Sequence, residues 1–158
     1  MADLDRAQMI YLIALSSGRG LMLRGVDLSS VDLRGLCLIG ANLNLAKLNA
    51  CSLGQADLEN ALLEEANLQY ADLSQVNLQG ANLRRASLIG ADLRTADLTE
   101  ADLSEADLRN ANLRGAVLNR ANLWQANLKD ANMILANIDG AKGLPPEIYE
   151  QLRNKTED

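Results

Sequence analysis

The chain of 158 residues contains no histidine and no phenylalanine, and only two cysteines, two prolines and one tryptophan. Without histidine, the commonest general base and the commonest metal ligand are both missing. The two cysteines, Cys37 and Cys51, cannot form a zinc site by themselves. No glycine-rich loop has the spacing that cradles phosphates. The composition therefore predicts a protein that is not an enzyme and that holds no metal or cofactor.

Aromatic residues make up only 3% of the chain, although 48% of the residues are hydrophobic, which favours one compact domain with a core too narrow for rings. No apolar stretch is long enough to cross a membrane. The apolar run 9–15 follows Asp3 and Asp5 instead of a basic segment, which argues against a signal peptide, so we expect a cytoplasmic protein. The formal net charge of −6 argues against direct binding to nucleic acid or to anionic membranes.

One five-residue repeat fills most of the chain. From Leu23 onward every fifth residue is apolar, with leucine up to Leu128 followed by Met133 and Ile138, which makes 24 repeats. The residue two positions earlier is also apolar and is alanine in 18 of the 24 repeats. Asp or Asn usually lies between the two. A fixed period of this kind is typical of a repeat architecture.

A period of five excludes a helix and fits a solenoid. On an α-helix, residues five apart are rotated by about 140°, so the leucines would form no apolar stripe. In a short strand, both apolar residues of the unit point one way and the polar residue points the other. Seven glycines occupy the last position of a repeat, where a tight corner needs positive φ. Coils of such units, stacked about 4.8 Å apart, would share backbone hydrogen bonds around a leucine column. By this pattern Cys51 points inward and Cys37 outward, so no disulfide is expected between them.

The unit A(D/N)LXX, as in Ala91-Asp92-Leu93-Arg94-Thr95, resembles the repeat of the pentapeptide-repeat family over about three quarters of the chain. The resemblance implies an all-β solenoid, a right-handed quadrilateral β-helix with four repeats per coil and about six coils. It also implies a role in scaffolding or regulation. Family members often dimerise end to end through the C-terminus, so a homodimer through that end is expected as one possibility.

The segments outside the repeats predict a short α-helix at each end, which divides the chain into a capping helix (1–20), a β-helix (21–140) and a C-terminal helix with a tail (141–158). Asp5 and Gln8 match a capping box, and Gly18 can end the first helix. We expect this helix to cover the first coil, where larger residues replace alanine. Those residues are Leu21, Val26, Val31 and Leu36.

The second helix is expected to begin at Pro145-Pro146 and to carry Ile148, Tyr149 and Leu152. It can serve either as a lid on the last coil or as a dimer contact. We expect the final residues, 154–158, to form a frayed tail.

With four repeats per coil, the outward residues fall on four faces, and one of these is acidic. It carries Asp57, Glu59, Asp97, Glu100 and Asp139 against a single base, Arg120. This face has three interpretations: a solvated wall, a docking surface for a basic protein, or an imitation of the phosphate rows of DNA. On another face, Glu64-Glu65, Arg84-Arg85 and Glu105 follow one another coil by coil, which predicts a ladder of ion pairs.

Three large apolar residues are expected to point outward near the end of the rod: Trp124, Ile134 and Leu135. A contiguous patch of them would indicate an interface. The alternative is that the C-terminal helix folds back and covers them.

Together these features favour a non-enzymatic interaction or scaffold module with an unidentified protein partner and no direct contact with nucleic acid or membrane. The alternative hypothesis is a DNA mimic that regulates a topoisomerase or another DNA-binding protein.

Overall fold

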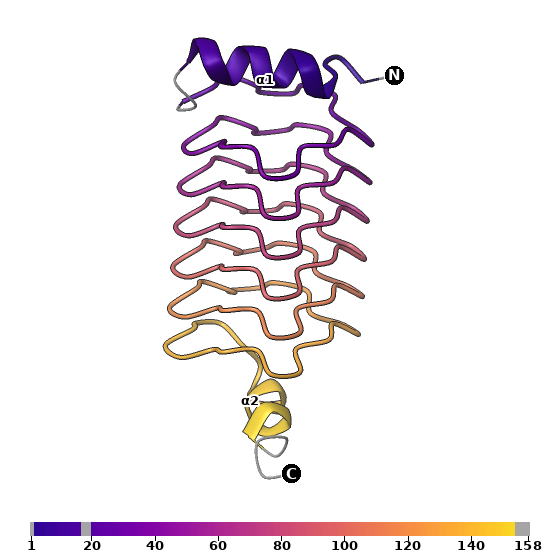
Figure 1. Cartoon of the computed structure of the whole chain (residues 1–158). Coiled ribbons are helices and arrows are strands. Elements are labelled where there is room, and N and C mark those ends of the chain that lie inside the picture. Colours follow the sequence, from indigo (N-terminus) through magenta and orange to yellow (C-terminus); the bar gives the residue numbers. More distant parts are fainter. Residues whose placement is uncertain (1, 17–19, 154–158) are drawn as a thin grey trace.

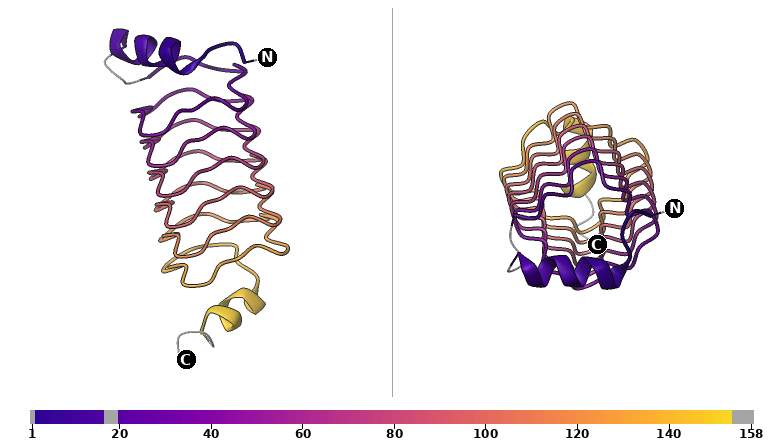
Figure 2. Two further views of the ribbon diagram at one scale, coloured as in Figure 1. Left: turned by 45° about the vertical axis from the view of Figure 1, so that its right-hand side comes forward. Right: turned by 90° about the horizontal axis from the view of Figure 1, so that it is seen from above.

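The protein is a rod of stacked coils with one helix at each end (Figure 1). The computed structural model describes residues 2–16 and 20–153. The residue before each central leucine forms a parallel bridge with the residue twenty positions later, from Met22–Asn42 to Asn122–Lys142. One coil therefore contains four repeats, as predicted, and residues 21–140 make six coils. Seen along the axis, the coils superpose in a four-sided outline (Figure 2, right).

Each corner is a tight turn whose third residue has positive φ. In the first such turn, the N–H of Val26 donates to the carbonyl of Leu23 over 3.2 Å, and Gly25 between them has φ +69°. The same conformation recurs at 17 residues that are not glycine, with φ between 54° and 61°. Leu45, one of these, donates its N–H to the carbonyl of Glu64 in the next coil at 2.9 Å. The ladder thus imposes the corner conformation even where no glycine is present.

The core is a single column of leucine and alanine along the axis of the rod. Every central leucine from Leu28 to Leu123 is at most 1% exposed, and the alanines from Ala41 to Ala121 lie beside them. Cys51 takes an alanine position and is buried, whereas Cys37 is exposed, as predicted.

Helix α1 (Arg6–Leu15) covers the N-terminal end of the column. The Asp5 carboxylate accepts the N–H of Gln8, and the Gln8 side chain accepts the N–H of Asp5, both at 2.8 Å, which confirms the predicted capping box. Met9 is fully buried against the column. The helix ends at Leu15, and Gly18, which was expected to end it, lies outside the described residues.

Two side chains also close the backbone edge of the first coil. Asp3 exchanges hydrogen bonds with Asp27, since its N–H donates to the Asp27 carbonyl at 2.6 Å and its carboxylate accepts the Asp27 N–H at 2.8 Å. The Arg6 guanidinium donates to the carbonyls of Asp32 and Arg34, at 2.9 Å and 3.1 Å. An open strand edge invites pairing with another chain, and these contacts cover part of it.

Helix α2 (Pro146–Arg153) lies below the last coil (Figure 1). Ile148 and Leu152 are partly buried against the core, and the Tyr149 hydroxyl donates to the Ala141 carbonyl at 3.1 Å. The chain leaves the last coil at Gly143, which has φ +79° and lies so close to Trp124 that a Cβ would come within 2.5 Å of the Trp124 Cα. The expected frayed tail, 154–158, falls outside the described residues.

Candidate protein-interaction site

The acidic face has the predicted composition, but three of its carboxylates, those of Asp57, Asp97 and Glu100, are bound to neighbouring side chains of the wall. Asp57, Asn77 and Asp97 lie on one ladder of parallel bridges. The Asn77 amide donates to Asp57 at 2.9 Å, and the Gln79 amide donates to Asp97 at 2.6 Å. Arg120 pairs with Glu100 at 2.9 Å. The neutral residues between the acidic coils therefore bridge the carboxylates.

Asp97 shows the electrostatic consequence of these contacts. Its partial burial disfavours the charged form, but hydrogen bonds from Thr99 and Gln79 outweigh that effect and hold the pKa of Asp97 below its usual range. Asp97 is thus an ionised group whose lone pairs are used within the protein, which leaves it less able to bind a partner than a free carboxylate. Glu59 and Asp139, also on this face, are in no ion pair within the described part of the chain.

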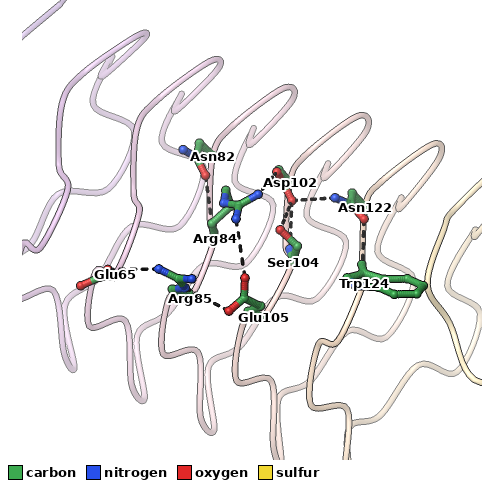
Figure 3. Close-up of polar contacts among 9 residues, drawn as sticks. All are labelled: Glu65, Asn82, Arg84, Arg85, Asp102, Ser104, Glu105, Asn122 and Trp124. Atoms are coloured by element: carbon green, nitrogen blue, oxygen red, sulfur yellow. Dashed lines mark hydrogen bonds and ion pairs between the residues drawn. The ribbon is translucent and has the colours of Figure 1, made fainter.

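The predicted ion-pair ladder is present on the neighbouring face (Figure 3). Arg85 contacts Glu65 at 3.9 Å on one side and Glu105 at 3.0 Å on the other, and Arg84 contacts Glu105 at 3.6 Å. Glu64 was expected to take part but forms no ion pair among the described residues; its backbone N–H instead donates to the Asn44 side chain.

Trp124 lies one coil beyond the ladder, with its ring at the surface (Figure 3). The side chain is 63% exposed. Its backbone is fixed, because the N–H donates to the Asn122 side chain at 3.2 Å and the carbonyl accepts the N–H of Glu105 at 2.9 Å. A large aromatic ring on a rigid backbone is a suitable anchor for an interface.

Helix α2 does not cover the exposed apolar residues, so that alternative is wrong. Ile134 is 38% exposed and Leu135 is 63% exposed. These two do not form one patch with Trp124 either, because ten residues, or half a coil, place them on the opposite corner of the rod. All three residues belong to the last coil, so they lie at two corners near the C-terminal end of the rod and do not form one face.

The backbone edge of that end is largely open. In earlier coils the N–H of each central leucine donates to the next coil, for example from Leu108 to the Asn127 carbonyl at 2.9 Å. In the described part of the last coil only Leu123 keeps such a bond, to Lys142, and the N–H groups of Leu128, Met133 and Ile138 have no acceptor. Three sides of the coil therefore present unpaired strand edges.

A groove of about 550 Å³ lies between this edge and helix α2. Leu128 and Ala131 line it from the coil, and Pro145 and Ile148 line it from the helix side, with Lys129 and Glu147 among the polar residues around it. Sequence patterns did not indicate this groove, because it forms only where the chain turns away from the stack. The end of the repeats before Pro145 was the one available signal.

The described residues contain no group of three or more Cys, Asp or Glu side chains arranged to hold a metal ion. Neither described helix has both the length and the apolar character needed to traverse a bilayer.

These features define a parallel β-helix whose last coil has exposed apolar residues and, within the described residues, unpaired backbone N–H groups. The chain belongs to the pentapeptide-repeat family: the family model "Pentapeptide repeats" matches it in eight copies, over residues 19–44, 41–80, 77–115 and 106–142. No curated protein sequence matches the chain significantly.

Several solved structures are similar to the protein. A pentapeptide-repeat protein of the Arabidopsis thaliana thylakoid lumen is 25% identical, with 89% of this chain and 79% of that chain covered and a TM-score of 0.50. HetL of the cyanobacterium Nostoc, a protein involved in heterocyst differentiation regulation, is 25% identical over 89% and 99% of the two chains, with a TM-score of 0.39. QnrB1, a plasmid-mediated fluoroquinolone resistance protein, is 20% identical over 89% and 90%, with a TM-score of 0.48.

Proposed function

We propose that the protein is a non-enzymatic interaction module that docks a partner protein at the C-terminal end of the rod. The observation that carries this proposal is the difference between the two ends. At the first coil, helix α1 lies over the end, and Asp3 and Arg6 bond to Asp27, Asp32 and Arg34 at its edge. At the last coil, the N–H groups of three central residues have no acceptor in the part of the chain that the structure describes, and a groove separates the edge from helix α2. Extended peptides bind such edges by adding a strand.

The surroundings of the open edge suit an extended, partly apolar segment of a partner. The groove is lined by Leu128, Ala131 and Ile148 together with polar residues such as Lys129, and the exposed ring of Trp124 lies on the same last coil. A second copy of the chain is the other occupant that this end can accommodate, as the family resemblance implies.

The DNA-mimic hypothesis receives less support. Asp57 and Asp97 lie two coils apart, which is about 10 Å, and both accept hydrogen bonds from amides of the wall. Such carboxylates do not form a continuous free row. A supercoiling assay with purified gyrase tests this hypothesis, and inhibition that disappears in an Asp97→Asn, Glu100→Gln variant would support it.

Affinity capture from the native host tests the proposed docking end. We expect Trp124→Ala to lose a partner that the wild type retains, because the anchor ring is removed. Tyr70→Ala is the matched control, since Tyr70 is 67% exposed but lies in the middle of the rod. The Asp97→Asn, Glu100→Gln variant should also retain the partner. Loss from that variant together with retention by Trp124→Ala would place the interface on the acidic face and overturn the proposal.

A further inference from the structure

Helix α1 has two apolar sides, although only one contacts the rod. At 100° per residue, Met9 and Ile13 point to one side, and Ala7, Tyr11 and Leu15 point to the other. Met9 is fully buried, whereas Tyr11 is 65% exposed and Leu15 is 67% exposed. A helix that is apolar all round is normally covered on both sides.

The outer side of α1 is uncharged. Arg6 is the only charged residue of the helix, and its guanidinium is engaged with the first coil. Gln8 is polar, but its side-chain oxygen accepts the N–H of Asp5. The chain as a whole has a net charge of −6, but this surface of α1 contains no carboxylate.

The outer side of α1 also has a hollow that a side chain of a second copy can fill. A shallow hollow of about 430 Å³ is lined by Leu4, Ala7, Gln8, Tyr11 and Leu12. If two α1 helices pair antiparallel with their centres near Tyr11, Leu15 of each copy lies over the hollow of the other. Ala7 then lies against Leu15 of the other copy and within one residue of its Ala14, and the small alanine side chains allow close approach. Such a contact repeats itself across a two-fold axis, as a symmetric dimer requires.

We propose that the outer side of helix α1 is a homodimer interface in which the helices of two copies pack antiparallel. Two copies of an acidic protein can meet here without like-charge contacts, and antiparallel helix dipoles attract. A membrane is a poorer occupant, because surface-binding helices carry Lys or Arg beside their apolar face and this helix has none free.

The dimer would have a defined shape. Because α1 lies at the N-terminal end of the rod, along one side of its outline (Figures 1 and 2), the dimer would join the two rods near their N-terminal ends and leave both C-terminal ends free. If those ends dock a partner as proposed above, the dimer would be bivalent.

Sedimentation velocity over a concentration series tests the interface. We expect the wild type to dimerise and Tyr11→Glu to weaken the dimer by more than about tenfold in Kd, since two carboxylates would then be buried. Tyr70→Glu, at a tyrosine of similar exposure on the rod wall, should dimerise like the wild type. Circular dichroism and thermal unfolding establish that both variants are folded.

Disulfide trapping places the contact. Ala7→Cys and Ala14→Cys are combined in a Cys37→Ser background; these positions are about 10 Å apart along one helix, too far for an intrachain disulfide. Oxidation should yield a covalent dimer, whereas Ala50→Cys in the same background should not.

A monomer at every concentration overturns the proposal, as does a dimer that Tyr11→Glu leaves intact and oxidation does not trap. Trp124→Ala should leave the dimer unchanged, which separates this test from that of the docking end.

Discussion

At the scale of single residues, the corners decide where glycine is needed. Seventeen other residues adopt the same positive φ, so the conformation alone does not demand glycine. Gly90 is different, because the Tyr70 ring of the preceding coil lies on it: a Cβ there would come within 2.6 Å of the ring. At Gly25, which has nearly the same φ, a Cβ would meet no atom within 4 Å.

Replacing Gly90 by alanine should therefore destabilise the protein more than the same change at Gly25. Both variants incur the cost of a left-handed side chain, about 1–2 kcal/mol, but only Gly90→Ala also displaces Tyr70. Thermal unfolding of each variant measures the difference. In a Tyr70→Ala background the two changes should cost the same, and a difference that persists there would show that the ring is not the cause.

At the scale of the element, each coil contributes four leucines to one column. Leu83 is fully buried in it, so Leu83→Ala should lower the free energy of unfolding by about 2–5 kcal/mol through the cavity it leaves. Arg94→Ala removes an exposed ion pair with Asp92 and should cost only about 0–1 kcal/mol. Chemical denaturation compares the two variants. Equal effects would contradict the importance of column packing.

The two end helices illustrate how elements of similar length differ in role. Helix α1 buries Met9 and carries Arg6 to the edge of the first coil, so it covers part of that end. Helix α2 packs Ile148 and Leu152 against the core and leaves the neighbouring edge open. The sequence predicted both helices, but it could not distinguish a closing helix from one that leaves a groove.

At the scale of the whole molecule, many aspartates on the coils are held ionised by their own repeat. Arg94 and Arg109 each donate to the carboxylate two residues earlier, and hydrogen bonds from these arginines lower the pKa of Asp92 and Asp107. The pKa of Asp32 is lowered likewise, first by hydrogen bonds from Arg34 and also by the charge of Arg6.

We therefore expect stability to fall in acid. An aspartate in the unfolded chain has a pKa of about 3.9, so below that pH the unfolded state binds more protons than the folded state. The stabilisation is complete above about pH 4 and is lost as the pH falls toward the lowered folded values. Thermal unfolding between about pH 2 and pH 7 measures this loss. The double variant Asp92→Asn, Asp107→Asn should lose less stability than the wild type as the pH falls. An unchanged dependence of stability on pH would show that these two aspartates do not cause the loss.

The sequence by itself determined the solenoid, its inward leucines and alanines, its positive-φ corners and the ladder between Arg85 and Glu105. These follow from the five-residue period, because a strict repeat gives every residue the same environment as its counterpart in the next repeat. The capping box at Asp5 could also be predicted, since it depends on residues three apart.

Only the tertiary structure decided which surfaces are available. Trp124 and Ile134 are both outward, but their position on opposite corners follows from the number of residues per coil. The amides that engage Asp57 and Asp97, the edge contact of Arg6 and the groove beside Leu128 all join segments that are distant in the sequence or lie where the repeat ends. At those places the period no longer constrains the chain, so contacts between coils and helices determine what a partner can reach.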